Sequence, residues 1–184
     1  MDGVKIIFIY LKGTVDCGLW YPKSNNFTLK EFTDADRERG IDDRKSTSGA
    51  TFYLGDCLVS WISKNKSSFS LSTTEAKCID VASCCTQVIW IKQTLEDLLV
   101  KYEDPIVIHY DNTSAINISK NHVIHSKTKH IPIKYHFLRE QVSQKVVKLE
   151  YIDTREPIAD IFTKPLPKEA FENLIHKLGV ISLQ

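Results

Sequence analysis

The chain has 184 residues, 42% of them apolar, which is enough for one sizeable hydrophobic core and favours a single domain. Its 24 lysines and arginines almost balance 23 acidic residues, so net charge alone gives no reason to expect a nucleic-acid partner. The five cysteines are an odd number without a Cys-x-x-Cys pair, so we expect an intracellular protein, cytoplasmic or nuclear, that is not secreted.

The chain opens on an apolar run and continues into strands. The run at residues 4–11 is too short to span a bilayer, so we expect a packing segment and no membrane partner, with a weak signal peptide as the lesser alternative. From Leu29 the sequence alternates as a strand does through residues 32–34. Two β-rich runs joined by Gly55 and Asp56 then predict a hairpin over residues 49–64.

Helical spacing replaces this alternation at Thr73. Apolar residues recur there every three to five positions, which predicts a long amphipathic helix ending near Lys101. The apolar run at 105–111 is typical of a buried strand reached through a helical crossover. Later patterns predict a short helix at 115–120, a helix near 134–144, a fifth strand at 146–152, a helix start at 156–162 and a terminal helix at 168–178. This order predicts an α/β fold in which helices flank a five-stranded mixed sheet.

Three aspartates are candidates for chemistry. Asp34, Asp111 and Asp160 close or follow β-prone or helix-start stretches that lie far apart in the sequence. This spacing suits a carboxylate cluster that forms on folding. Carboxylates of this kind can hold two magnesium ions, which activate water and stabilise the leaving oxygen when a phosphodiester is hydrolysed.

Basic residues are concentrated in one part of the chain. Between His122 and Lys148 there are six lysines and arginines but only one acid, a distribution that suits a polyanion and equally suits a solvated surface. Seven residues have the chemistry of nucleic-acid contacts, although turn, cap and packing roles explain them comparably well: Arg44, Lys45, Asn112, His125, Lys127, Lys129 and His130. The three tryptophans each lie in an apolar run, so we expect core or stacking-scaffold positions for them rather than platforms for nucleic-acid bases.

A series of motifs carries a closer resemblance. They include Asp34-Ala35-Asp36, the segment 42–49, the segment 72–76, Tyr110-Asp111-Asn112, the segment 125–131 and the segment 159–166. In this order, over residues 5–179, they resemble the C-terminal ribonuclease H region of Ty1/copia-type retrotransposon Pol polyproteins. The resemblance implies a ribonuclease H-like fold, an RNA/DNA hybrid as substrate, and reverse transcriptase or integrase portions of Pol as partners.

The same resemblance implies a division of the chain and a metal site. Residues 1–28 correspond to the segment joining reverse transcriptase to ribonuclease H, 29–166 to the ribonuclease H-like domain, and 167–184 to a C-terminal helix and tail. The four-carboxylate site for two Mg²⁺ ions maps onto Asp34, position 77, Asp111 and Asp160. Lys77 stands where the family pattern has glutamate, and Glu31 stands where it has glycine.

Lys77 determines what we expect of the activity. An ammonium and a divalent ion about 4 Å apart repel by roughly 8 kcal/mol at an effective dielectric constant of 20, before solvent and side-chain movement reduce this. Glu75 is not expected to substitute because it lies about 200° around the helix, and Asp80 lies a turn further on. We therefore expect impaired or absent hydrolysis, with Lys77 paired to neighbouring aspartates in a metal-free site. The alternatives to an enzyme are a nucleic-acid-binding pseudoenzyme and an inert relic of a transposon reading frame.

Overall fold

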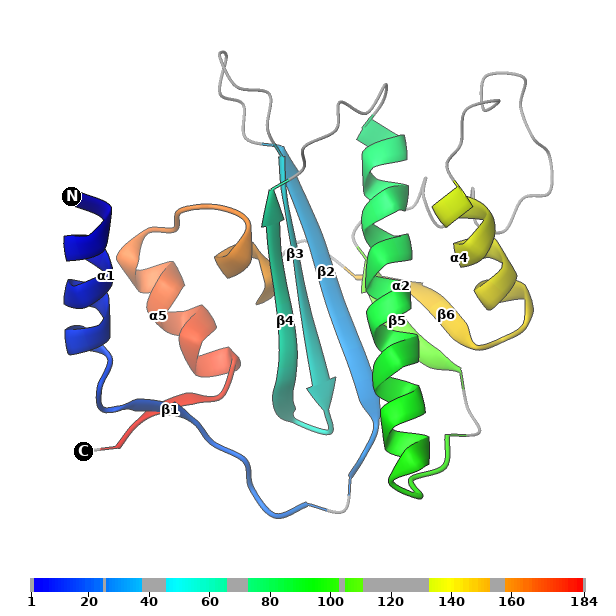
Figure 1. Cartoon of the computed structure of the whole chain (residues 1–184), viewed down its shortest axis with the longest axis horizontal. Coiled ribbons are helices and arrows are strands. Elements are labelled where there is room, and N and C mark those ends of the chain that lie inside the picture. Colours follow the sequence, from blue (N-terminus) through cyan, green and yellow to red (C-terminus); the bar gives the residue numbers. More distant parts are fainter. Residues whose placement is uncertain are drawn as a thin grey trace.

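A five-stranded mixed sheet forms the centre of the fold (Figure 1). The computed structural model describes residues 2–24, 26–37, 46–65, 73–102, 105–110, 133–152 and 158–183, and within them leaves out the side chains at 2, 34–37, 46, 65, 73–78, 134 and 135. The sheet and its flanking helices confirm the predicted α/β architecture. The helix predicted at 115–120 lies outside the described residues.

The strands run in the order β4-β3-β2-β5-β6. Their bounds are β2 Leu29–Arg37, β3 Ser46–Leu54, β4 Cys57–Asn65, β5 Ile106–Tyr110 and β6 Val147–Tyr151. The first three form the antiparallel part, and it includes the predicted hairpin. The pairs β2–β5 and β5–β6 are parallel and therefore need crossover connections, in which α2 (Thr73–Asp97) and α4 (Ile133–Ser143) lie.

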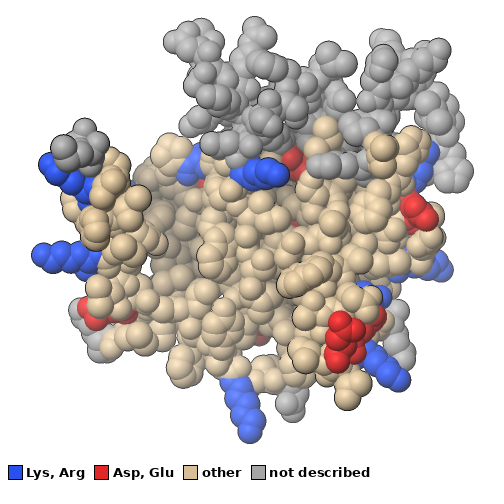
Figure 2. Space-filling model, viewed as in Figure 1, with Lys and Arg blue, Asp and Glu red and all other residues tan. Residues whose placement is uncertain are grey.

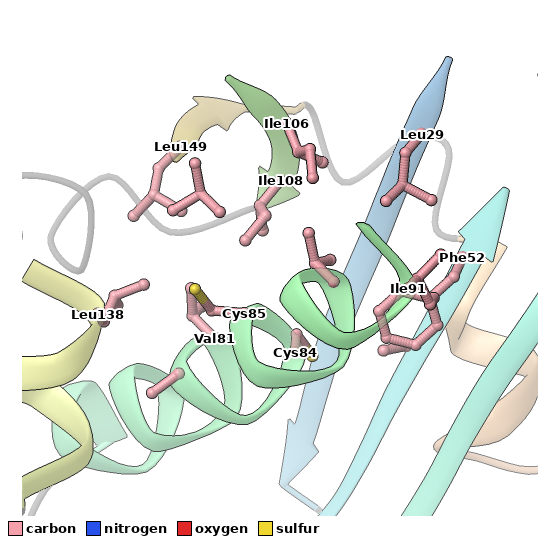
Figure 3. Packing of buried hydrophobic residues seen from close by; sticks show 14 of the residues in the cluster. Leu29, Phe52, Val81, Cys84, Cys85, Ile91, Ile106, Ile108, Leu138 and Leu149 are labelled. Atoms are coloured by element: carbon pink, nitrogen blue, oxygen red, sulfur yellow. The ribbon is translucent and has the colours of Figure 1, made fainter. Parts of the chain in front are cut away.

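The main core lies between α2, α4 and one face of the sheet (Figure 3). Buried residues of α2 recur at helical spacing, at positions 81, 84, 85, 88, 91 and 95, and this places one continuous stripe against the strands. The helix ends at Asp97, earlier than predicted. Leu99 adopts a positive φ of 67°, and the Val100 amide donates to the Leu95 carbonyl at 2.9 Å, which closes the helix.

A second, smaller cluster covers part of the other face. It is built from Tyr53, Leu58 and Leu178, against which residues from η2 (Ile158–Phe162) and from a two-stranded sheet pack. That small sheet pairs β1 (Cys17–Leu19) with β7 (Val180–Ser182), which follows α5 (Lys168–Lys177). Sequence analysis missed both strands, because three-residue strands show too little alternation to recognise.

Two expectations about apolar side chains were wrong. Residues 4–11 form most of the helix α1 (Asp2–Gly13), and its large apolar side chains between Val4 and Leu11 are 53% to 71% exposed instead of packed. The tryptophans Trp20, Trp61 and Trp90 are 61%, 54% and 62% exposed, so none of them belongs to the core. Within the described ranges, no helix has both the length and the apolar character needed to cross a membrane.

Candidate active site

A row of paired residues across three strands locates the first candidate aspartate. The backbone of Asp34 in β2 pairs with Gly49 in β3, which in turn pairs with Ser63 in β4. In the other direction, Thr33 pairs with Tyr110 at the end of β5. Thr33 and Tyr110 immediately precede Asp34 and Asp111, so the residues before two predicted ligands are register partners. Asp111 itself and the side chain of Asp34 lie outside what the structure describes.

Gly49 allows η2 to approach the sheet beside this row. A Cβ atom on Gly49 would lie 2.7 Å from the Ala159 carbonyl oxygen and 2.7 Å from Cγ2 of Thr163, closer than any side chain tolerates. The Ser63 hydroxyl donates to the Phe162 carbonyl at 2.8 Å, and this hydrogen bond attaches η2 to the neighbouring strand β4. The short helix carrying Asp160 is therefore fixed against the strands at the level of Asp34.

Asp160 is a buried carboxylate with a cationic partner. Asp160 is 7% exposed, and its Oδ2 lies 2.7 Å from Nζ of Lys164, four residues later in the chain. The Asp160 carbonyl also accepts from the Thr163 amide at 3.0 Å and from the Thr163 hydroxyl at 3.2 Å. Burial of an unpaired charge is costly, and the ion pair with Lys164 offsets part of this cost. This ion pair was not predicted, although a spacing of four residues between an acid and a lysine could have indicated it.

The helix α2 reaches the same part of β3 from the other face. Ser48, which precedes Gly49, donates its hydroxyl to Oδ1 of Asp80 at 2.7 Å, and Asp80 is buried. Lys77 lies in α2 three residues before Asp80, hence about one turn earlier, and its side chain is among those not described. The Ser48 contact was not predictable from the sequence, since nothing in a polar run distinguishes one serine from its neighbours.

A buried acid lies between β2 and α2, behind the candidate site. Glu31 is fully buried, and neither of its carboxylate oxygens has a hydrogen-bond partner within the part of the chain that the structure describes. Burial raises the pKa of Glu31 to about 8, an effect that the nearby Cys84 thiol partly offsets. That thiol donates to the Thr33 hydroxyl at 3.4 Å, and burial raises the pKa of Cys84 as well. This environment favours the neutral acid near neutral pH.

The predicted nucleic-acid contacts belong to segments that the structure leaves out. Outside the described residues lie Arg44, Lys45, Asn112, His125, Lys127, Lys129 and His130. They stay predictions.

The described side chains include only part of the predicted magnesium site. Among them, no group of three or more histidine, cysteine, aspartate or glutamate residues could hold a metal ion. Asp160 is the one predicted ligand whose side chain is described, and Lys164 already pairs with one of its oxygens. Position 77 is a lysine, and its side chain is not described. We therefore assign no chemical step to a bound metal.

Comparisons with known proteins show which sequences and structures this chain is similar to. No protein-family model matches the chain. It is 37% identical over 182 residues to the retrovirus-related Pol polyprotein from transposon RE2 of Arabidopsis thaliana, covering 99% of this chain and 12% of that protein. It is 39% identical over 181 residues to the Pol polyprotein from transposon TNT 1-94 of Nicotiana tabacum, covering 98% and 14% respectively. The chain thus spans about an eighth of the length of these relatives.

Among solved structures, an RNase H domain is similar in fold. It is the N-terminal RNase H domain of a Mycobacterium tuberculosis protein, solved as a fusion protein with maltose-binding protein, and the TM-score is 0.50. The match covers 81% of this chain and 98% of that chain at 12% identity.

Proposed function

We propose that this chain, which belongs to the copia-type retrotransposon Pol polyproteins and has an RNase H-like fold, binds RNA/DNA hybrids but cleaves their RNA strand weakly or not at all. The ancestral reaction would be endonucleolytic hydrolysis of the RNA strand. The observation that carries the proposal is the convergence of η2, with its buried Asp160, on the strand position of Asp34, combined with a lysine at position 77.

The charges near the site support weak catalysis. Asp34, Asp111 and Asp160 would be the ligands of Mg²⁺ if it binds, and Mg²⁺ would supply an activated water and stabilise the leaving oxygen. One of these ligands is already neutralised by Lys164. A second cation at position 77 would add a repulsion of several kcal/mol to any divalent ion nearby, even after solvent reduces the full value. We therefore expect little occupancy by metal at physiological concentrations.

Binding does not need the metal. The electrostatic attraction of a hybrid comes from cations that contact phosphates and is independent of sequence. The proposed contacts are Arg44, Lys45, Asn112 and the segment from His125 to His130, together with the exposed Lys64 at the end of β4. This electrostatic contribution predicts that the affinity for the hybrid falls steeply as the salt concentration rises.

Restoring the carboxylate tests the proposal. The purified chain and its Lys77→Glu and Lys77→Gln variants are incubated with a labelled RNA/DNA hybrid and a magnesium titration. We expect cleavage to appear or rise at least roughly tenfold with glutamate, because it removes the repulsion and adds a ligand. Glutamine is the matched control, since it removes the charge without adding a ligand. Asp160→Asn in the Lys77→Glu background should abolish the gained activity.

The outcomes separate the alternatives. Vigorous magnesium-dependent cleavage by the unaltered chain would contradict the proposed impairment. Salt-dependent hybrid binding with no cleavage, even in Lys77→Glu, would favour a pseudoenzyme. Absence of binding at low salt would favour an inert relic of a transposon.

The exposed helix α1 favours contact with another portion of Pol. Its apolar side chains between Val4 and Leu11 lie in solvent, and Figure 1 shows α1 beside α5 and remote from the central sheet. A contiguous exposed apolar surface of this kind marks an interaction site. We propose that a reverse transcriptase portion covers it. Amide hydrogen exchange in α1 should slow when that portion of a copia-type Pol is joined ahead of the chain, and unchanged exchange would contradict this.

A further inference from the structure

Trp61 forms an exposed aromatic surface backed by a second ring. It lies in β4, is 54% exposed, and is nearly parallel to Phe162 of η2, with an angle of 15° between the rings and 6.4 Å between their centroids. Offset parallel rings at this separation attract each other. Phe162 covers part of Trp61, and the rest of the indole faces solvent.

This pair is held close to the candidate active site. Phe162 follows Asp160 by two residues, and its carbonyl accepts the hydrogen bond from Ser63. Ser63 belongs to the row that contains Gly49 and Asp34. Trp61 is two residues from Ser63 along the strand, so the strand spacings place its backbone about 12 Å from that of Asp34. Contacts from two elements therefore orient Trp61 within reach of a ligand bound at Asp34 and Asp160.

The surroundings favour a nucleic acid as the occupant. Lys164, two residues after Phe162, has a side chain that is about one-third exposed. Lys64 is also exposed, but it follows Trp61 by three residues in β4 and so starts from the opposite face of the strand. Figure 2 shows lysine or arginine side chains near the upper ends of β3 and β4, beside an acidic side chain, and the middle of the same face is largely uncharged. A hybrid duplex roughly 20 Å wide would cover both the site and Trp61. Its wide, shallow minor groove presents sugar rings on which an aromatic face can pack.

We propose that Trp61, supported by Phe162, is a substrate-contacting residue that packs on the sugar rings of an RNA/DNA hybrid and sets its position relative to Asp34 and Asp160. This inference rests on the proposed function, because it assumes that a hybrid binds at that site. It adds a specific contact that the metal chemistry does not require. Binding through Trp61 should therefore persist whether or not the chain cleaves.

Fluorescence of a single-tryptophan protein tests the contact. The chain has three tryptophans, so Trp20→Phe together with Trp90→Phe leaves Trp61 as the reporter. Titration with an RNA/DNA hybrid should quench or shift its emission at the same hybrid concentration at which an independent anisotropy measurement reports binding. Acrylamide quenching of Trp61 should fall in the complex.

Substitutions measure how much the contact contributes. Trp61→Ala should weaken hybrid binding roughly tenfold, in the range found for aromatic contacts to nucleic acids. Trp61→Phe preserves the packing on Phe162 and should keep most of the affinity, which also guards against a folding defect. Trp90→Ala is the matched control: Trp90 is similarly exposed, but lies ten residues beyond Asp80 on α2, about 15 Å along the helix.

Each outcome decides the inference. Hybrid binding with unchanged affinity in Trp61→Ala and an unresponsive Trp61 signal would overturn it while leaving the proposed function standing. Failure of the unaltered chain to bind any hybrid would remove the proposed function and this inference together. A change in oligomeric state on Trp61→Ala, with hybrid affinity unaltered, would identify the surface as a protein interface and overturn the inference as well.

Discussion

Replacing Glu31 with glutamine should remove most of the pH dependence of folding stability that this buried acid causes. The side chain is completely buried, and burial raises its pKa from 4.5 to about 8. At 1.36 kcal/mol for each unit of pKa, the difference between the folded and unfolded chains amounts to about 5 kcal/mol. This is a large fraction of the free energy of unfolding of a domain of this size.

The direction follows from which state binds the proton. Below pH 4.5 the carboxyl is protonated in both states and has no effect on pH dependence. Between pH 4.5 and about 8 the unfolded chain releases the proton while the folded chain keeps it, so stability falls as pH rises. Above about 8 the loss is complete, because the folded chain must then bury a carboxylate or unfold.

Urea denaturation followed by circular dichroism measures this effect. The free energy of unfolding is compared at about pH 5, 6.5 and 8 for the unaltered chain and for Glu31→Gln, with the slope m checked for constancy. The range stops below pH 9, where cysteine thiols begin to ionise in the unfolded chain while Cys85, with a pKa raised to about 12, stays neutral in the folded one. Glutamine has no carboxyl group to ionise, so the stability of the variant should not fall with pH in this way and should exceed that of the unaltered chain chiefly toward the alkaline end.

A control separates Glu31 from other acids. Glu150 lies on β6, and its pKa is lowered by a hydrogen bond from Lys148 at its exposed position, so Glu150→Gln should leave the fall with pH in place. If Glu31→Gln loses stability with pH as steeply as the unaltered chain does, the carboxyl is not buried as described and the reasoning is wrong.

Three further substitutions probe the packing that positions the candidate site. Gly49→Ala should destabilise the chain by about 1–3 kcal/mol, because its Cβ would meet the Ala159 carbonyl and Thr163; an unchanged urea midpoint would refute the close approach of η2. Ser48→Ala should lower the free energy of unfolding in urea by about 1–3 kcal/mol, because it removes a hydrogen-bond donor from buried Asp80. Thr14→Ala removes a hydroxyl that donates to the Tyr10 carbonyl on exposed α1, so it should cost much less. Equal effects would refute a special role for Ser48. Phe52→Ala, which empties a fully buried position in the main core, should cost about 3–5 kcal/mol in thermal or urea unfolding, and a loss below about 1 kcal/mol would contradict the packing.

The sequence by itself determined the elements whose periodicity is long enough to recognise. The hairpin of β3 and β4, the long helix α2 and the strand β5 were all predictable, since burial of one face imposes a regular spacing over many residues. The motif series identified the family. The ion pair between Asp160 and Lys164 was not predicted, although their spacing of four residues was there to be noticed. The short strands β1 and β7 pair residues 17–19 with residues 180–182, a contact too distant in the sequence for any local pattern to indicate.

Only the tertiary structure decided which side chains are buried and which are exposed. Trp61 lies in an apolar run, yet β4 is an edge strand and one face of the indole is left open beside η2. Glutamate is usually found at the surface. Glu31, however, pairs with Phe52 in β3 and with Ile108 in β5, and this position places its side chain beneath α2. In both cases the environment comes from elements far away in the chain, and solvent exposure depends on how those elements pack rather than on the residue or its immediate neighbours.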